Sequence, residues 1–190
     1  MRTMLCPRCW GGTVQSVRDF YGKVSRGQCE LCAGTGVRPD RQLSPHFWLS
    51  ELLRSDTAIR RGIPNDPTAA HELALERLCL EVLEPVREQF GPWRVNSGLR
   101  LPMLNAAIGG SSTTSAHQRG DAADGVPATP GVTLREVMLW IVSSSIRFDQ
   151  AIWEGTWLHF GRVSPTGFDR RQVLMMFPGP GGRPGYEPWN

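Results

Sequence analysis

The chain has 190 residues, of which 40% are hydrophobic, including seven Trp and seven Phe, so it can build one ordinary domain and a small additional module. It has no run of about 18 apolar residues, which excludes a membrane span, and its start lacks an apolar stretch of signal-peptide length, which predicts synthesis in a cytoplasm. The net charge of +3 resides in residues 1–40, where six basic residues accompany three acidic ones; this bias is too small to predict nucleic-acid binding.

Two CxxC pairs, CPRC and CELC, place Cys6, Cys9, Cys29 and Cys32 within residues 1–40. A CxxC turn points both sulfurs the same way, and two such turns complete a tetrahedral zinc site with four cysteine ligands. A segment this short buries little core, so the metal would supply its folding energy. We therefore predict a structural zinc ribbon; a redox CxxC, which here lacks a βαβ context, and a chance pairing are the alternatives.

The second cysteine pair extends into CELCAGTG, which resembles the CxxCxGxG repeats of DnaJ-type zinc modules. The first pair, in CPRCWGG, keeps only CxxCxG and has Thr13 where the last Gly would stand. The resemblance implies a zinc ribbon or knuckle but no co-chaperone function. The fifth cysteine, Cys79, lies on the apolar face of a predicted helix, and we expect it to be a buried thiol without chemistry.

The sequence of residues 41–177 predicts one continuous globular domain that begins with helices. Ser44 followed by Pro45 is a helix-start signal. Residues 68–90 carry apolar side chains at helical spacing, and Pro85 within them predicts a kink or a late break.

Strands dominate the second half of this zone, with one further helix at residues 133–145. Strands are predicted over residues 93–100, 121–126, 149–154, 157–163 and 170–177. Long helices first and strands later, without regular alternation, indicate an α+β domain with a central antiparallel sheet and flanking helices. Residues 178–190 have eight Pro or Gly in thirteen positions, so we expect a flexible tail, with docking of Tyr186 or Trp189 as the alternative.

Polar, metal-competent side chains gather in SAHQRGDAAD and in WEGTWLHFG. His117 and Asp124 are seven positions apart across a Gly/Ala-rich turn and strand, which can bring both side chains to one edge. Alternation along the later strand puts the side chains of Trp157 and His159 on one face. The side chain of Glu154, at the end of the preceding strand, can reach the same site. Zinc hydrolases need about three such ligands, an open position for water and a carboxylate that accepts its proton. A satisfied His117 in a turn and a solvated Glu154 are the alternative.

Three segments resemble the LAS-type zinc peptidases, in the branch of D-Ala-D-Ala carboxypeptidases and dipeptidases. SAHQRGDAAD fits its SxHxxGxAxD signature, and IWEGTWLHFG resembles its second signature, a Glu shortly before Trp-x-His. VNSGLRLPMLNAAIGGSS resembles the SGxR…N…GG segment of the members encoded by bacteriophages. The resemblance covers roughly residues 46–177 and implies a hedgehog/DD-peptidase-like fold. The matched positions of the first signature are Ser115, His117, Gly120, Ala122 and Asp124.

The resemblance also implies a role for each matched side chain. The implied ligands of a catalytic zinc are His117, Asp124 and His159. Glu154 would be general base and acid, Arg100 would meet the substrate carboxylate or the developing oxyanion, and Ser115 would bind substrate or support the site. The segment SGLRLP lacks the aromatic residue and the Ser that often flank this Arg, and the Glu-to-His spacing of five is usual in the phage group. Both departures leave the substrate open.

These features predict a zinc peptidase that acts on peptidoglycan stem peptides, at D-Ala-containing or L-Ala-D-Glu bonds. Made in the host cytoplasm, it would be a phage lysis enzyme, or a virion-borne enzyme whose ribbon or tail binds other virion or tail proteins. A structural virion component that uses the peptidase fold for docking is the alternative, against which the intact ligand set argues. Nucleic-acid binding by the ribbon is disfavoured because its aromatic residues are few.

Overall fold

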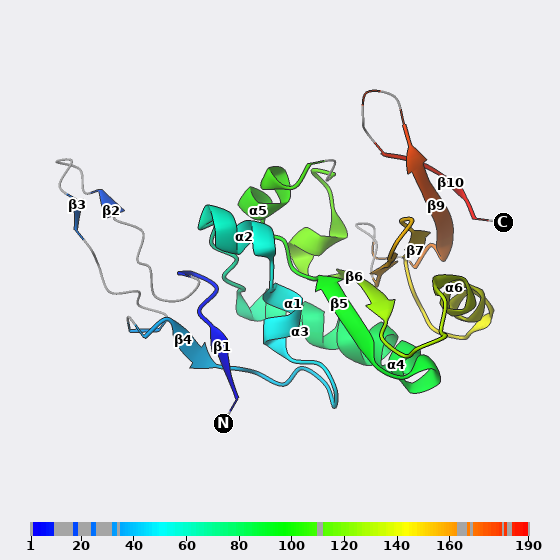
Figure 1. Cartoon of the computed structure of the whole chain (residues 1–190), viewed down its shortest axis with the longest axis horizontal. Helices are drawn as coiled ribbons and strands as arrows, with labels where there is room; N and C mark the ends of the chain where they lie inside the picture. Colours follow the sequence, from blue (N-terminus) through cyan, green and yellow to red (C-terminus); the bar gives the residue numbers. More distant parts are fainter. Residues whose placement is uncertain are drawn as a thin grey trace.

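The computed structural model describes residues 2–9, 17–18, 24–25, 32–33, 35–109, 112–162, 167, 169–179, 181 and 184–189. The molecule is elongated along one axis (Figure 1). The N-terminal strands lie at one end, most of the helices and of the main sheet lie in the middle, and the C-terminal hairpin lies at the other end together with one further helix.

The described residues of the N-terminal zone form two small antiparallel strand pairs, β1 (Thr3–Leu5) with β4 (Val37–Pro39) and β2 (Val17–Arg18) with β3 (Val24–Ser25). Met4 of β1 is 5% exposed and belongs to the same hydrophobic core as the helices that follow. The zone is therefore packed onto the rest of the chain at β1. The domain boundary near residue 40 stays a prediction.

Two short helices, α1 (Leu49–Leu53) and α2 (Asp56–Arg61), follow this zone. The predicted helix start at Ser44 is wrong, because the Ser44 hydroxyl donates to Glu84 Oε1 at 2.6 Å and does not cap a helix. Ser55 caps α2 instead, with its hydroxyl accepting a backbone N–H of the first turn. No helix in the described ranges is both long and apolar enough to cross a bilayer.

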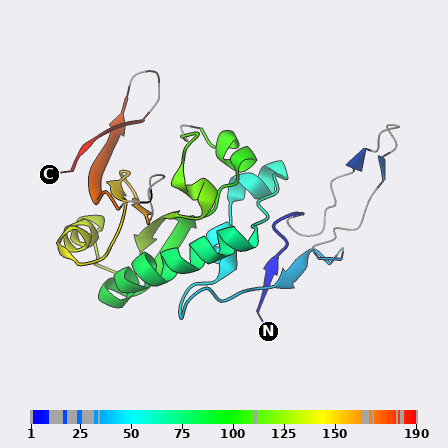
Figure 2. The same ribbon diagram turned by 180° about the vertical axis from the view of Figure 1, so that it is seen from behind.

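A long helical rod consists of α3 (Ala69–Leu78), the π-helical segment η1 (Cys79–Leu83) and α4 (Glu84–Phe90). Figure 2 shows this rod running across the sheet. Pro85 lacks an N–H and would collide with the preceding turn of an α-helix, and the wider π-turn comes directly before it. The irregularity predicted at Pro85 is therefore a π-turn within a continuous rod.

The main sheet has six strands in the order β10-β9-β7-β8-β6-β5. In chain order they are β5 (Trp93–Ser97), β6 (Ala122–Pro127), β7 (Gln150–Trp153), β8 (Leu158–Gly161), β9 (Gln172–Pro178) and β10 (Pro184–Pro188). Neighbouring strands run antiparallel except β7 and β9, which run parallel. The α+β class is confirmed, and the predicted antiparallel sheet is corrected to a mostly antiparallel one.

The two faces of this sheet have different environments. One face carries Ala151, Leu158 and Phe160, which are fully buried in a core shared with the helical rod and with α6 (Leu134–Ser143). Strand alternation puts Asp124 on the other face. The sheet therefore separates the hydrophobic core from the candidate site.

The sequence predicted a flexible tail over residues 178–190, but the described part of this segment includes a strand, β10. β10 pairs antiparallel with β9, and Gly185 lies so close to Phe177 that a Cβ there would collide with the aromatic ring. Prolines are tolerated at both ends of β10 because it is the outermost strand, so part of its N–H row needs no partner strand. The high Pro and Gly content of this segment disfavours a strand, but pairing with β9 outweighs that local preference.

Candidate metal centre

Three potential metal ligands meet on the sheet face that lies away from the core. The pairing of β6 with β8 sets Asp124 opposite His159, with Asp124 Oδ1 2.9 Å from His159 Nδ1. The short helix η2 (Ala116–Arg119) adds His117, whose Nε2 lies 3.1 Å from each of those two atoms. All three side chains are buried.

Hydrogen bonding fixes which nitrogen of His117 faces the centre. Its Nδ1–H donates to the Gly98 carbonyl oxygen at 2.6 Å, which leaves the lone pair of Nε2 directed at Asp124 and His159. Gly120 ends η2 in a left-handed conformation with φ of 78°, and this turn leads the chain from His117 into β6. The small residues of the segment thus set the direction of its two ligands.

The protonation states suit a cation. Burial lowers the pKa of His117 below 6.5, although the nearby Asp124 carboxylate opposes this. Burial alone would raise the pKa of Asp124, but its contacts with His117 and His159 hold it far below the usual range. An ionised carboxylate and two imidazole nitrogens therefore converge on one point, where a cation could bind.

The donor set and its spacing fit zinc. Two imidazole nitrogens and one carboxylate oxygen are borderline ligands of the kind that catalytic zinc takes, with a fourth position left for water. Tetrahedral bonds of about 2.0–2.2 Å separate ligand atoms by roughly 3.3–3.5 Å. The atoms of His117, Asp124 and His159 need to move apart by only a few tenths of an ångström to reach that spacing.

Glu154 stands beside this centre without belonging to it. It follows β7 directly, its N–H donates to the Trp157 carbonyl oxygen, and its Oε2 accepts the indole N–H of Trp157 at 2.8 Å. Burial, helped by the charge of Asp124, raises the pKa of Glu154. The carboxylate is therefore held in place and has a raised proton affinity, as a general base requires.

Arg100 supplies the positive charge of the site. Its backbone N–H donates to the His117 carbonyl oxygen at 3.0 Å, and its guanidinium lies 3.6 Å from Asp124 Oδ2 and 3.4 Å from Ser115 Oγ. Arg100 Nε is buried, and no described residue accepts its hydrogen. The loop position of Ser115 brings its hydroxyl to Arg100 and not to the three ligands.

Tyr186 belongs to the surroundings of this site, whereas the sequence offered its docking only as an alternative to a flexible tail and did not indicate where it would dock. Strand register places Asp124, His159, Ile152, Leu174, Met176 and Tyr186 on one face of the sheet. Burial raises the pKa of Tyr186, and the charges of Glu154 and Asp124 raise it further, so the phenol lies within their electrostatic reach. Because β10 is recognisable only through its long-range pairing with β9, no local pattern identifies Tyr186.

A second cluster of possible ligands lies in the N-terminal zone. The sulfurs of Cys6, Cys9 and Cys32 lie within 4.8 Å of one another, with Cys9 Sγ 3.6 Å from Cys32 Sγ. The N–H of Gly36 points at Cys32 Sγ at 3.3 Å, as backbone N–H groups do around thiolate ligands. Cys29, the fourth predicted ligand, lies outside the described residues, and the zinc ribbon with four cysteine ligands stays a prediction.

A family model described as Peptidase M15 matches residues 45–150, which is more than half of the chain. The match contains Arg100, Ser115, His117 and Asp124, and ends before β8 supplies His159. No curated protein matches the chain.

Proposed function

The chain belongs to the peptidase M15 family of zinc peptidases, and from this premise we propose that it hydrolyses peptide bonds in the stem peptides of bacterial peptidoglycan. The observation that carries the proposal is the convergence of His117, Asp124 and His159 next to a carboxylate outside the ligand set, Glu154. The bond would be a D-Ala-containing or an L-Ala-D-Glu bond. A zinc ion at this centre would supply Lewis-acid activation of water and of the scissile carbonyl.

The remaining steps fall to side chains of the chain itself. Glu154 accepts the proton of the attacking water and returns it to the leaving amine, and the hydrogen bond from Trp157 holds its carboxylate in place. Arg100, whose guanidinium lies 3.6 Å from Asp124 Oδ2, binds the substrate carboxylate or the developing oxyanion. Ser115 keeps the guanidinium of Arg100 near the centre.

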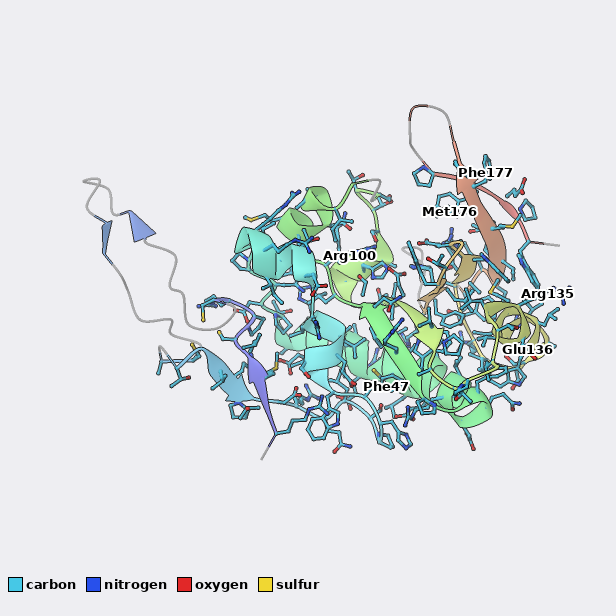
Figure 3. The ribbon with its side chains drawn as sticks, in the orientation of Figure 1. Phe47, Arg100, Arg135, Glu136, Met176 and Phe177 are labelled. Carbon is cyan, nitrogen blue, oxygen red and sulfur yellow. The ribbon has the colours of Figure 1, made fainter. Side chains whose placement is uncertain are left out.

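The hairpin of β9 and β10 provides the wall along which the stem peptide lies. Ile152, Leu174 and Met176 continue the row of ligands across the sheet, and Tyr186 stands opposite Met176. In Figure 3, Met176 and its neighbour Phe177 are labelled on β9; alternation puts Phe177 on the other face. An apolar row ending in a phenol suits alanine methyl groups and a peptide backbone.

We place this activity in a phage, as a lysis enzyme or as a virion-borne enzyme. The support is the likeness of the Arg100 segment, and of the spacing from Glu154 to His159, to phage-encoded peptidases. In this proposal a second zinc, held by the N-terminal cysteines, is structural. The competing function is a virion docking module without catalysis, which has no use for the raised pKa of Glu154 beside three ligands.

Digestion of purified peptidoglycan with mass analysis of the released fragments tests the proposal. The wild type should release alanine or cut stem peptides, the fragment masses should name the bond, and a chelator should stop the reaction. Glu154→Gln should keep the zinc and lose about 10²–10⁴-fold in rate, whereas Glu88→Gln, an exposed change on α4, should match the wild type. A wild type that cuts no type of peptidoglycan would overturn the proposal in favour of docking.

A further inference from the structure

Among the described residues, the turn of the cysteine cluster contacts the loop between α2 and α3. Pro7 and Arg8 are the two residues enclosed by Cys6 and Cys9. The Pro7 carbonyl oxygen accepts the N–H of Asn65 at 2.9 Å. Arg8 donates to Asp66 Oδ2 through Nε at 3.1 Å and through Nη2 at 2.7 Å. The CPRC turn therefore binds two consecutive residues of the loop: the Pro7 carbonyl binds Asn65, and the Arg8 side chain binds Asp66.

Asn65 carries this contact to the catalytic side of the domain. Its side chain is fully buried, and Nδ2 donates to the carbonyl oxygens of Leu53 at 3.1 Å and of Leu99 at 2.8 Å. Its Oδ1 accepts the N–H of Leu101 at 3.0 Å. The amide thus binds the peptide group before Arg100 and the peptide group after it.

Such a clamp fixes the backbone from which the Arg100 side chain extends. With both adjacent peptide groups bound to Asn65 and its own N–H bound to the His117 carbonyl oxygen, Arg100 has little backbone freedom. Its guanidinium reaches Asp124 and Ser115 at 3.4–3.6 Å, contacts that a small backbone shift would break. Misplacement of a catalytic group by about 1 Å can cost about 10²-fold in rate.

We infer that Cys6, Cys9 and Cys32 bind a metal ion and that the resulting knuckle positions Arg100 through Asn65. Among the described residues before Leu43, Met4 alone belongs to the hydrophobic core, so apolar burial holds the CPRC turn only weakly and a metal supplies the remaining order. Loss of the metal releases the Pro7 carbonyl and leaves a buried N–H on Asn65 without its partner. The role of Arg100 rests on the proposed function; the physical link does not.

The first experiment measures the link without substrate. Cys9→Ser should hold one zinc fewer per chain than the wild type. In hydrogen exchange, its Leu101 amide, whose N–H binds Asn65, should exchange at least about tenfold faster. Cys79→Ala, which removes a buried thiol outside the cluster, should change neither quantity. Equal zinc content in Cys9→Ser and the wild type, or an unchanged Leu101 amide, overturns the inference even if the enzyme cuts no peptidoglycan.

The second experiment separates positioning from general destabilisation. Asn65→Ala should keep all the zinc of the wild type and lower kcat/KM by about 10–100-fold. In an Arg100→Ala background the same change should cost almost nothing further, because its effect passes through that side chain. Multiplying losses would show that Asn65 only stabilises the fold. Because Asn65→Ala leaves the cysteines intact, this test stands even if Cys9→Ser does not fold.

Discussion

Gly98 lies where two backbones meet, and replacing it tests the packing of the site. A Cβ on Gly98 would come within 2.8 Å of Leu52 Cα and closer still to the Leu52 carbonyl oxygen, both part of the main chain of α1. Main chain inside a helix cannot swing aside as a side chain can. Gly98→Ala must therefore push β5 and α1 apart by several tenths of an ångström or more.

The cost can be worked out from this overlap. Overpacking of this kind destabilises a protein by about 1–3 kcal/mol, and a chain of this size loses about 2–4 °C in Tm per kcal/mol. Gly98→Ala should therefore melt about 2–12 °C lower. The Gly98 carbonyl also accepts the Nδ1–H of His117 at 2.6 Å. Its displacement should weaken zinc binding by about 10–100-fold, since that is the usual effect of losing such a supporting bond.

Differential scanning fluorimetry and competition with a chromogenic chelator measure the two effects. Gly109→Ala is the matched control, because a Cβ there meets no described atom within 4 Å. It should melt at or slightly above the wild-type temperature, since Gly→Ala reduces the freedom of the unfolded chain. A Gly98→Ala protein with the melting temperature and zinc affinity of the wild type would refute the reasoning.

Three further variants probe single contacts. Burial raises the pKa of Glu154 and the indole N–H of Trp157 lowers it in part, so Trp157→Phe should move the acidic limb of the pH–rate profile to higher pH; an unmoved limb would contradict this. Burial raises the pKa of Glu84, but hydrogen bonds, of which the one from Ser44 is the strongest, hold it below 4.5. These hydrogen bonds therefore stabilise the fold above pH 4.5. Their contribution is lost as the pH falls through the lowered pKa of Glu84. Ser44→Ala should therefore lose about 1–2 kcal/mol in urea melts at pH 7 and less near pH 3; equal losses would refute the assignment. Tyr186→Ala should keep its zinc and raise KM for stem peptides, and an unchanged KM would remove the hairpin from the substrate site.

Local patterns in the sequence determined much of the fold. The alternating stretches that contain Asp124 and His159 are strands, because period-two alternation and short apolar runs act within one segment. The helix predicted at residues 133–145 is α6, and its start has the Thr133 capping box that such a pattern favours. Ser44 failed as a start signal because its hydroxyl has a partner forty positions away, which no local window contains.

The residue types in the sequence also predicted the chemistry of the site, but they did not predict its geometry. Two histidines, an aspartate and a nearby glutamate predict a zinc peptidase because they stand in segments that resemble the signatures of the LAS-type zinc peptidases; the donor set alone also suits other metal ions. Only the tertiary structure decided that β10 pairs with β9 and brings Tyr186 to the ligand face, and that Asn65 joins the cysteine turn to the Arg100 loop. Both depend on hydrogen bonds between segments far apart in the chain. Their energy exists only after the chain has folded, so residue spacing carries no trace of them.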